Sequence, residues 1–179
     1  GLQGIEEIRV FADLNPIPLI LSYPPRHADP GIAFRFKVEQ STPVRAAART
    51  KDGVWHVGGT WLRASGGGCT APSQTTGSGL WRDQLNTVSG AMWPRPEGKS
   101  RLKLRVMHPM DTGLAGAIPA FYIETLQVLD AQGEELASLR TYEPVSENPV
   151  LSFNLHHQGP VRIVGRDIQG NRIDARVAP

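Results

Sequence analysis

The clearest regularity in this chain is an alternation of apolar and polar residues with a period of two. In residues 32–38, isoleucine, phenylalanine and valine occupy every second position, and alanine, arginine and lysine stand between them. Residues 101–106 repeat this pattern with leucine and valine set against arginine and lysine. Because successive side chains of a strand point to opposite faces, each segment predicts a strand with one buried face. Strands are predicted over residues 5–12, 17–23, 32–38, 44–50, 54–57, 60–64, 101–106, 121–129, 134–142, 150–155, 161–166 and 173–177.

Turn residues separate these predicted strands at short intervals. Asp-Pro-Gly at residues 29–31 predicts a turn before the strand at 32–38. Lys-Asp-Gly at residues 51–53 predicts a hairpin, because an Asp-Gly pair readily accepts the positive φ of a tight turn. The chain has 19 glycines and 15 prolines, which suits many short strands joined by turns.

One segment departs from the period of two. Trp81, Leu85 and Val88 stand at helical spacing within residues 80–88, and they predict a short amphipathic helix. The alternative is an irregular segment pinned by Trp81 and Trp93.

The chain also has a compositional boundary in its middle. Residues 70–79 are mostly small and polar, which is typical of a linker. A length of 179 residues is enough for one large or two small domains, and the linker favours two. We therefore predict an all-β fold of two immunoglobulin-like β-sandwich domains, joined by a flexible, Gly-rich, Cys-bearing linker with a short helix. The predicted division is residues 1–65, 66–98 and 99–179.

Charge and composition limit the classes of function. The net charge is only +2 and the arginines are spread along strands, so no nucleic-acid partner is expected. No apolar run is long enough to cross a bilayer, and no targeting segment is expected in the chain as given. The five histidines make no recognised ligand spacing with the cysteine or with a carboxylate, so we expect no metal. The chain has no Gly-x-Ser-x-Gly elbow, and its glycine run lacks the Lys-Ser/Thr of a phosphate loop, so hydrolase and nucleotide-binding classes are not expected. The overall expectation is no cofactor and no catalytic residue.

The candidate chemistry lies in the single cysteine. Cys69 directly follows Gly66, Gly67 and Gly68, and a small polar run follows it. Three glycines leave the backbone unconstrained, so the sequence predicts a thiol on a mobile arm with these glycines as its hinge. With one cysteine no internal disulfide is available, so oxidation would either link two chains as a homodimer through Cys69 or cap the thiol with a small molecule.

Three interpretations of Cys69 follow from the residues alone. A mobile thiol suits covalent carriage, because a flexible arm can present an attached group to several enzymes. A cysteine nucleophile would need a distant histidine to approach it, and a triglycine hinge gives poor preorganisation. The third interpretation is a free thiol in a linker with no chemical role.

Several runs of residues carry a resemblance to a known family. In the first half they are residues 8–16, residues 34–36 and the Gly67-Gly68-Cys69 ending. In the second half they are His108-Pro109-Met110-Asp111-Thr112-Gly113, residues 118–120, Ser146-Glu147-Asn148-Pro149 and residues 151–153. Through these runs the first half resembles SoxY, the sulfur-carrying subunit of the bacterial thiosulfate-oxidising Sox system, and the second half resembles its partner subunit SoxZ. The chain is similar to fused SoxYZ-like carriers associated with quinoprotein dehydrogenases.

This resemblance implies two immunoglobulin-like sandwiches, a periplasmic location and covalent attachment of sulfur intermediates to Cys69. It implies structural and partner-facing roles for the SoxZ-like motifs. In SoxY the Gly-Gly-Cys arm ends the polypeptide, whereas here Cys69 is followed by Thr70 and then by a whole domain. The arm is therefore a loop, which has to carry two stretches of backbone into any partner cleft.

The resulting expectation is a periplasmic, non-enzymatic carrier that holds a persulfide or S-thiosulfonate on Cys69 for sulfur-oxidising or quinoprotein-associated enzymes. The alternative is a dehydrogenase-associated binding module in which Cys69 is incidental. A thiol-dependent enzyme is a third class, and it would need an unusually low thiol pKa.

Overall fold

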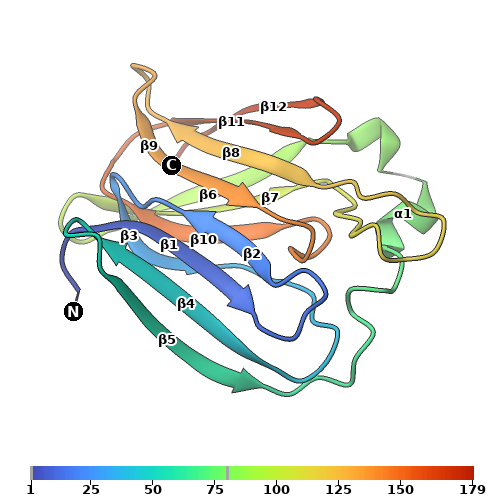
Figure 1. Ribbon diagram of the computed structural model, residues 1–179. Coiled ribbons are helices and arrows are strands. Elements are labelled where there is room, and N and C mark those ends of the chain that lie inside the picture. The colour runs from blue at the N-terminus through green and yellow to red at the C-terminus, as the bar shows by residue number, and fades with distance from the viewer. Residues whose placement is uncertain (1, 80) are drawn as a thin grey trace.

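The computed structural model of the chain describes residues 2–79 and 81–179, and it is built almost entirely of strands. The strand bounds are β1 Ile5–Ala12, β2 Leu19–Tyr23, β3 Ala28–Ala33, β4 Thr42–Thr50, β5 Trp55–Leu62, β6 Val88–Arg95, β7 Lys99–Val106, β8 Ile123–Leu129, β9 Glu135–Thr141, β10 Val150–Leu155, β11 Val161–Asp167 and β12 Arg172–Val177. The larger sheet has the order β12-β11-β8-β9-β2-β1-β4-β5, and the smaller has the order β3-β10-β7-β6. The prediction of an all-β fold is confirmed (Figure 1).

Strands from the two halves of the chain meet in both sheets. In the larger sheet β2 pairs with β9, so that Leu21 lies opposite Thr141. In the smaller sheet β3 pairs with β10, so that Ile32 lies opposite Phe153. The first and second halves are therefore hydrogen-bonded to each other through the backbone.

One hydrophobic core lies between the sheets and draws on both halves. The Tyr23 ring from the first half packs against the Phe153 ring from the second, with centroids 5.9 Å apart. Leu21 and Leu151 are likewise fully buried in this cluster. Burying a side chain of this size contributes about 1.5–3 kcal/mol, so the shared core ties the halves together energetically.

Several strands lie where the alternation predicts them. β1 and β10 have the predicted bounds, and β7, β8, β9, β11 and β12 differ from them by one or two residues at an end. The predicted turn at 51–53 is present, with Gly53 at φ 83°. Positive φ at this position is the physical reason for the Asp-Gly pair.

The strand predicted at residues 32–38 begins and ends earlier than expected, since β3 spans Ala28–Ala33 and the predicted strand over residues 34–38 is absent. β3 runs through Pro30 and Gly31, so the prediction of a turn at residues 29–31 is wrong. β3 is an edge strand, where a proline without an N–H group is tolerated because one side of the strand has no ladder partner. Side chains at alternate positions from 32 to 38 still pack against the core, as the period of two predicts.

The two predicted strands at 54–57 and 60–64 form one continuous strand, β5. Position 59 in this strand requires glycine, because a Cβ atom there would come within 2.8 Å of the Val44 carbonyl oxygen. β5 is the other edge of the larger sheet, and Trp55, Val57 and Trp61 on one of its faces are exposed.

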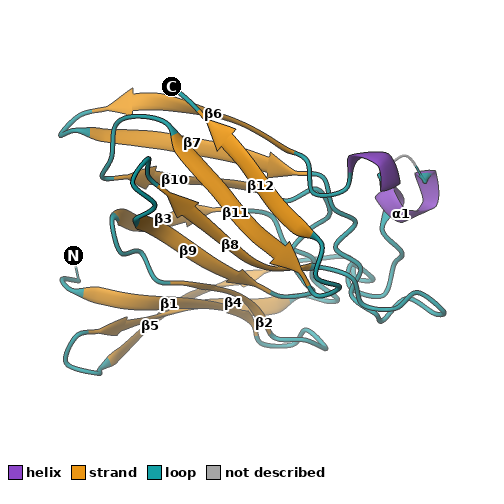
Figure 2. Cartoon of the chain, turned by 90° about the horizontal axis from the view of Figure 1, so that it is seen from above, coloured by secondary structure: helices purple, strands orange, loops and turns teal. Residues whose placement is uncertain are grey.

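The helix predicted at residues 80–88 is wrong in its position. Residues 82–84 form a single 3₁₀ turn, and Val88 already begins β6, an edge strand that includes Pro94. Leu80 lies outside the described residues. The α-helix α1 spans Gln74–Ser78, within the predicted linker, and lies at one end of the sandwich (Figures 1 and 2).

Candidate functional site

The glycine run before Cys69 lies against the backbone of residues 38 and 39. The Gly67 N–H donates to the Glu39 carbonyl oxygen at 3.0 Å, and the Gly68 N–H donates to the Val38 carbonyl oxygen at 3.1 Å. These two contacts fix the chain directly before the thiol. The predicted arm is docked in this conformation, and its mobility stays a prediction.

The glycines allow this close approach. A Cβ atom at Gly68 would come within 2.4 Å of the Val38 carbonyl oxygen, a distance that no real side chain could adopt. Gly66 and Gly67 have φ values of 100° and 79°, a region that disfavours every residue with a side chain. Glycine is thus required at these positions for the segment to dock. The same residues would also give the undocked segment a flexible backbone. The predicted hinge role of the three glycines stays a prediction.

One carboxylate holds the cysteine itself. Oε2 of Glu39 accepts hydrogen bonds from the backbone N–H groups of Cys69 at 3.0 Å and Thr70 at 3.1 Å. The Thr70 hydroxyl donates to Oε1 of the same carboxylate at 3.0 Å. From the other side, the Thr112 hydroxyl donates to the Cys69 carbonyl oxygen at 2.5 Å. Cys69 is 1% exposed as a result.

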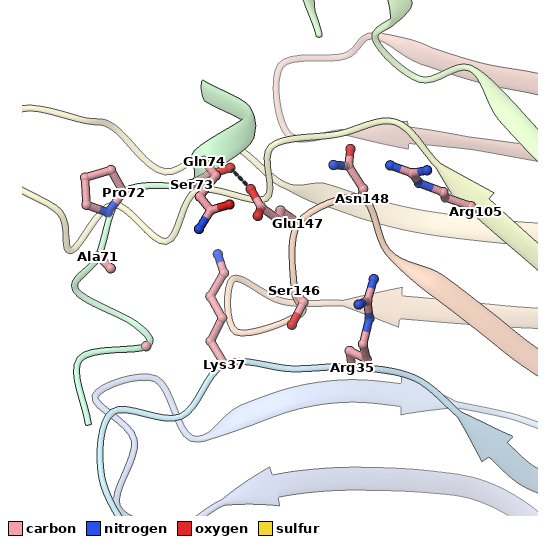
Figure 3. Close-up of a pocket in the computed structure, with 11 residues that line it drawn as sticks. Arg35, Lys37, Ala71, Pro72, Ser73, Gln74, Arg105, Ser146, Glu147 and Asn148 are labelled. Carbon is pink, nitrogen blue, oxygen red and sulfur yellow. Dashed lines mark hydrogen bonds between the residues drawn. The ribbon is translucent and has the colours of Figure 1, made fainter. Parts of the chain in front are cut away.

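Two further carboxylates hold the segment after the cysteine. Asp111 accepts hydrogen bonds from the Ser73 N–H at 3.2 Å and from the Thr76 hydroxyl at 2.5 Å. Glu147 accepts from the Ser73 hydroxyl at 2.5 Å, drawn as a dashed line in Figure 3, and from the Thr75 N–H at 2.9 Å. We call Glu39, Asp111 and Glu147 the carboxylate clamp.

The environment of the thiol disfavours its ionised form. Burial raises the pKa of Cys69 to about 11, the Glu39 carboxylate adds to the rise, and the Lys37 ammonium group opposes it. In this conformation the thiol is protonated at neutral pH. Because the thiolate is the nucleophile, Cys69 is held in an unreactive state.

Lys37 lies near Cys69 and near two carboxylates of the clamp, Asp111 and Glu147. Its Nζ donates to the Met110 carbonyl oxygen. Burial lowers the pKa of Lys37, and the nearby Asp111, Cys69 and Glu147 oppose that shift. Lys37 is therefore the cation that faces the clamp from the first half of the chain.

His108 supports the run that supplies two of these contacts. Its Nδ1 accepts a hydrogen bond from the Met110 N–H at 3.0 Å, and its Nε2 lies 3.6 Å from the Asp167 carboxylate. Burial lowers the pKa of His108 to about 4, although Asp167 opposes the shift, so the ring is neutral at neutral pH. The residues that follow it, Asp111 and Thr112, are thereby placed to hold the cysteine segment.

A cleft opens beside the docked segment, with a volume of about 380 Å³. Its walls come from Gly68 and residues 71–74 of the linker, from residues 146–148 of the second half, and from the cationic side chains of Arg35, Lys37 and Arg105 (Figure 3). Within the described part of the chain, no group of three or more His, Cys, Asp or Glu side chains could hold a metal ion. No helix among the described residues is long and apolar enough to cross a membrane.

Sequence reasoning singled out Cys69 and its glycines but missed the clamp. Asp111, Thr112 and Glu147 lie in the two most distinctive SoxZ-like runs, which were assigned structural and partner-facing roles only. The structure brings both runs onto the cysteine segment. Glu39 carries no sequence signal, because it stands 30 residues before Cys69 and only the sheet topology brings the two together.

Together these features define a class of protein: a two-sheet β protein whose single thiol is sequestered at the junction of its halves. The profile of the family described as "Sulfur oxidation protein SoxY" matches residues 1–69, and that of "Sulphur oxidation protein SoxZ" matches residues 94–178. The chain is therefore a fused SoxYZ-like protein, with a SoxY domain followed by a SoxZ domain. Both are immunoglobulin-like β-sandwich families, as the predicted fold class requires. No curated protein matches the chain.

Proposed function

We propose that this protein is a sulfur carrier that holds sulfur intermediates covalently on Cys69 for partner enzymes. The observation that carries the proposal is that the SoxY match ends on Cys69, the only cysteine of the chain. The SoxY and SoxZ families together support a carrier role in sulfur oxidation. The Gly67-Gly68-Cys69 ending is the segment on which such a group would be carried.

The closed segment acts as a shelter for the thiol in this proposal. A persulfide or S-thiosulfonate on an exposed thiol would be open to attack by any other thiol in solution. Loading and unloading require the segment to leave Glu39 and Thr112, which exposes Cys69 and returns its pKa toward the ordinary value. A partner that binds the undocked segment better than the docked one would shift this equilibrium.

The chemistry of attachment can be reproduced with tetrathionate. The Cys69 thiolate attacks a central sulfur of tetrathionate, a new bond from Sγ to that sulfur gives the S-thiosulfonate Cys69 Sγ–S–SO₃⁻, and thiosulfate leaves with the electron pair of the broken central sulfur–sulfur bond. The thiolate sulfur is oxidised and the leaving group is reduced. A carrier with a buried thiol forms this adduct slowly, at a rate limited by undocking of the segment.

The proposal includes a periplasmic location and partners among sulfur-oxidising or quinoprotein-associated enzymes. Both rest on the resemblance to Sox carriers. Fractionation of cells that make the protein tests the location, and affinity capture with Cys69→Ser as a stable partner trap tests the partners. A disulfide-linked homodimer needs an undocked segment, because Cys69 is buried when docked.

A binding module is the second candidate, and a specific observation favours it. Trp55, Val57 and Trp61 expose 40%, 60% and 59% of their surface along edge strand β5, where a partner could cover them. In this class the buried Cys69 serves only packing. The two candidates make opposite predictions for substitution of Cys69.

The discriminating experiment replaces Cys69→Ser in cells that depend on the protein for sulfur oxidation. We expect sulfur oxidation to be lost while the variant protein is folded and still binds its partner. Trp61→Ser is the matched comparison, since the binding module requires that residue and the carrier chemistry does not. Unchanged sulfur oxidation in the Cys69→Ser cells would refute the carrier.

A further inference from the structure

The cleft beside the cysteine segment concentrates positive charge. Three cationic side chains, Arg35, Lys37 and Arg105, and one carboxylate, Glu147, line it. The chain as a whole has a net charge of only +2, so this excess is local. A concave site with one sign of charge attracts counter-ions more strongly than a flat surface does.

The single carboxylate is already engaged. Glu147 accepts hydrogen bonds from Ser73 and Thr75, and these hold the linker in place. Arg35 and Arg105 differ from it, because their guanidinium groups make no hydrogen bond or ion pair to any residue that the structure describes. The cleft therefore offers two guanidinium groups with free donors.

Backbone pairing places these side chains. Phe36 forms a bridge to Val145, the Ser146 N–H donates to the Arg35 carbonyl oxygen at 3.0 Å, and the Lys37 N–H donates to the Pro144 carbonyl oxygen at 2.7 Å. In this extended segment alternate residues share a face, so Arg35 and Lys37 point into the same cleft (Figure 3). Arg105 enters from β7, whose backbone is paired on both sides.

We propose that this cleft binds a divalent sulfur oxyanion of the sulfate or thiosulfate class, with Arg35 and Arg105 as its main donors. Guanidinium groups match the geometry of oxyanions and form charge-assisted hydrogen bonds to two oxygens at once. Lys37 adds a third positive charge to the wall of the cleft. The choice of a sulfur oxyanion over other oxyanions rests on the proposed function. It is supported by the position of the cleft, since Gly68 and Ala71, on either side of Cys69, form part of its wall.

The same oxyanion chemistry has two sources: a free anion, or the sulfonate end of a group attached to Cys69. Calorimetric titration of thiosulfate into the Cys69→Ser chain, at constant ionic strength, measures the free anion alone. We expect saturable binding that Arg35→Gln and Arg105→Gln each weaken by about tenfold or more, as loss of a charge-assisted hydrogen bond predicts. Arg172→Gln is the matched control on exposed β12, and it should leave the affinity unchanged.

The second arm uses the wild-type chain carrying the S-thiosulfonate made with tetrathionate. If the attached group occupies the cleft, free thiosulfate no longer binds and Arg105→Gln increases the rate at which dithiothreitol removes the adduct. If the adduct leaves the affinity for thiosulfate unchanged, the site takes free anions. Absence of saturable binding, or equal weakening by Arg172→Gln, would overturn the proposed site.

This test is separable from that of the proposed function. Thiosulfate binding without any sulfur on Cys69 in cells would leave the oxyanion site standing and remove the carrier. Sulfur on Cys69 without thiosulfate binding to the cleft, and with adduct removal unaffected by Arg105→Gln, would do the reverse.

Discussion

The sandwich core and the cysteine segment are held to the protein by different forces. The core joins both halves through buried apolar side chains such as Tyr23 and Phe153. Residues 66–76 are held mainly by hydrogen bonds to the carboxylate clamp and to the backbone of residues 38 and 39. Apolar burial in the core is lost only on unfolding, whereas the hydrogen bonds that hold residues 66–76 can be replaced by hydrogen bonds to water. We therefore expect the cysteine segment to undock without opening the core.

The largest effect is expected in the core. Phe153→Ala should lower the free energy of unfolding by about 3–5 kcal/mol, through lost burial and the cavity left behind. Because the two halves share this core, denaturant unfolding followed by tryptophan fluorescence and by circular dichroism should give one coincident transition. Arg172→Gln, on the exposed face of β12, is the control and should change little. Two separate transitions would show that the halves unfold independently and would contradict the shared core.

A smaller effect on stability but a large one on reactivity is expected at Glu39. Burial is the main cause of the raised pKa of Cys69, and Glu39→Gln removes the charge that adds to it and weakens the hydrogen bonds to Cys69 and Thr70. The rate of Cys69 labelling by iodoacetamide at pH 8 should rise by about tenfold to one hundredfold, the range for hydrogen bonds to a charged group. The unfolding transition should stay nearly unchanged.

Glu6→Gln is the control, since Glu6 is an exposed carboxylate on β1 that ion-pairs with Arg49. A labelling rate that Glu39→Gln leaves at the wild-type value would mean that Glu39 does not keep the segment docked.

The pH dependence of labelling gives a third contrast between the docked segment and an ordinary thiol. With the folded-state pKa raised to about 11, the labelling rate should climb about tenfold per pH unit past pH 9. The urea-unfolded chain should level off near the ordinary value of 9.0. Between about pH 9 and pH 11 the folded protein keeps the thiol proton and the unfolded chain loses it. The folded protein should therefore reach its maximum labelling rate at a higher pH than the unfolded chain. A folded profile that levels off at the same pH as the unfolded one would contradict the sheltered thiol.

The smallest effect is expected at Thr112. Thr112→Val keeps the shape of the side chain and removes the hydrogen bond to the Cys69 carbonyl oxygen. Loss of one neutral hydrogen bond should increase the labelling rate by about threefold to tenfold. Thr87→Val, which removes an exposed hydroxyl bonded to Gln84, is the control for the same change elsewhere. A larger increase in labelling rate for Thr112→Val than for Glu39→Gln would contradict the prediction that Glu39 contributes more than Thr112 to keeping the segment docked.

Much of the fold was predictable because burial imposes a period of two on strands. β1 and β10 follow directly from it, and Gly53 marks its hairpin. β6 was missed because its sequence, with Ser89, Gly90 and Pro94, lacks alternating apolar residues. β6 lies at an edge of the smaller sheet, and its backbone hydrogen bonds to β7, rather than an alternating side-chain pattern, define it as a strand.

The site was predictable only in its central residue. A lone cysteine after three glycines stands out in any reading, and the resemblance to SoxY adds the role. The clamp was not predictable, since Glu39, Asp111 and Glu147 lie 30, 38 and 74 residues from the groups they hold. The sequence alone does not show that residues so far apart along the chain are in contact. The small polar composition of the linker instead predicts a mobile segment. The docked linker therefore had to be seen in three dimensions.

Intact-mass analysis of the protein isolated from its own cells without reductant tests the central claim most directly. We predict a population that carries additional sulfur on Cys69, removable by dithiothreitol and absent from the Cys69→Ser chain. A mass that always equals that of the unmodified polypeptide, in cells actively oxidising sulfur compounds, would contradict the account.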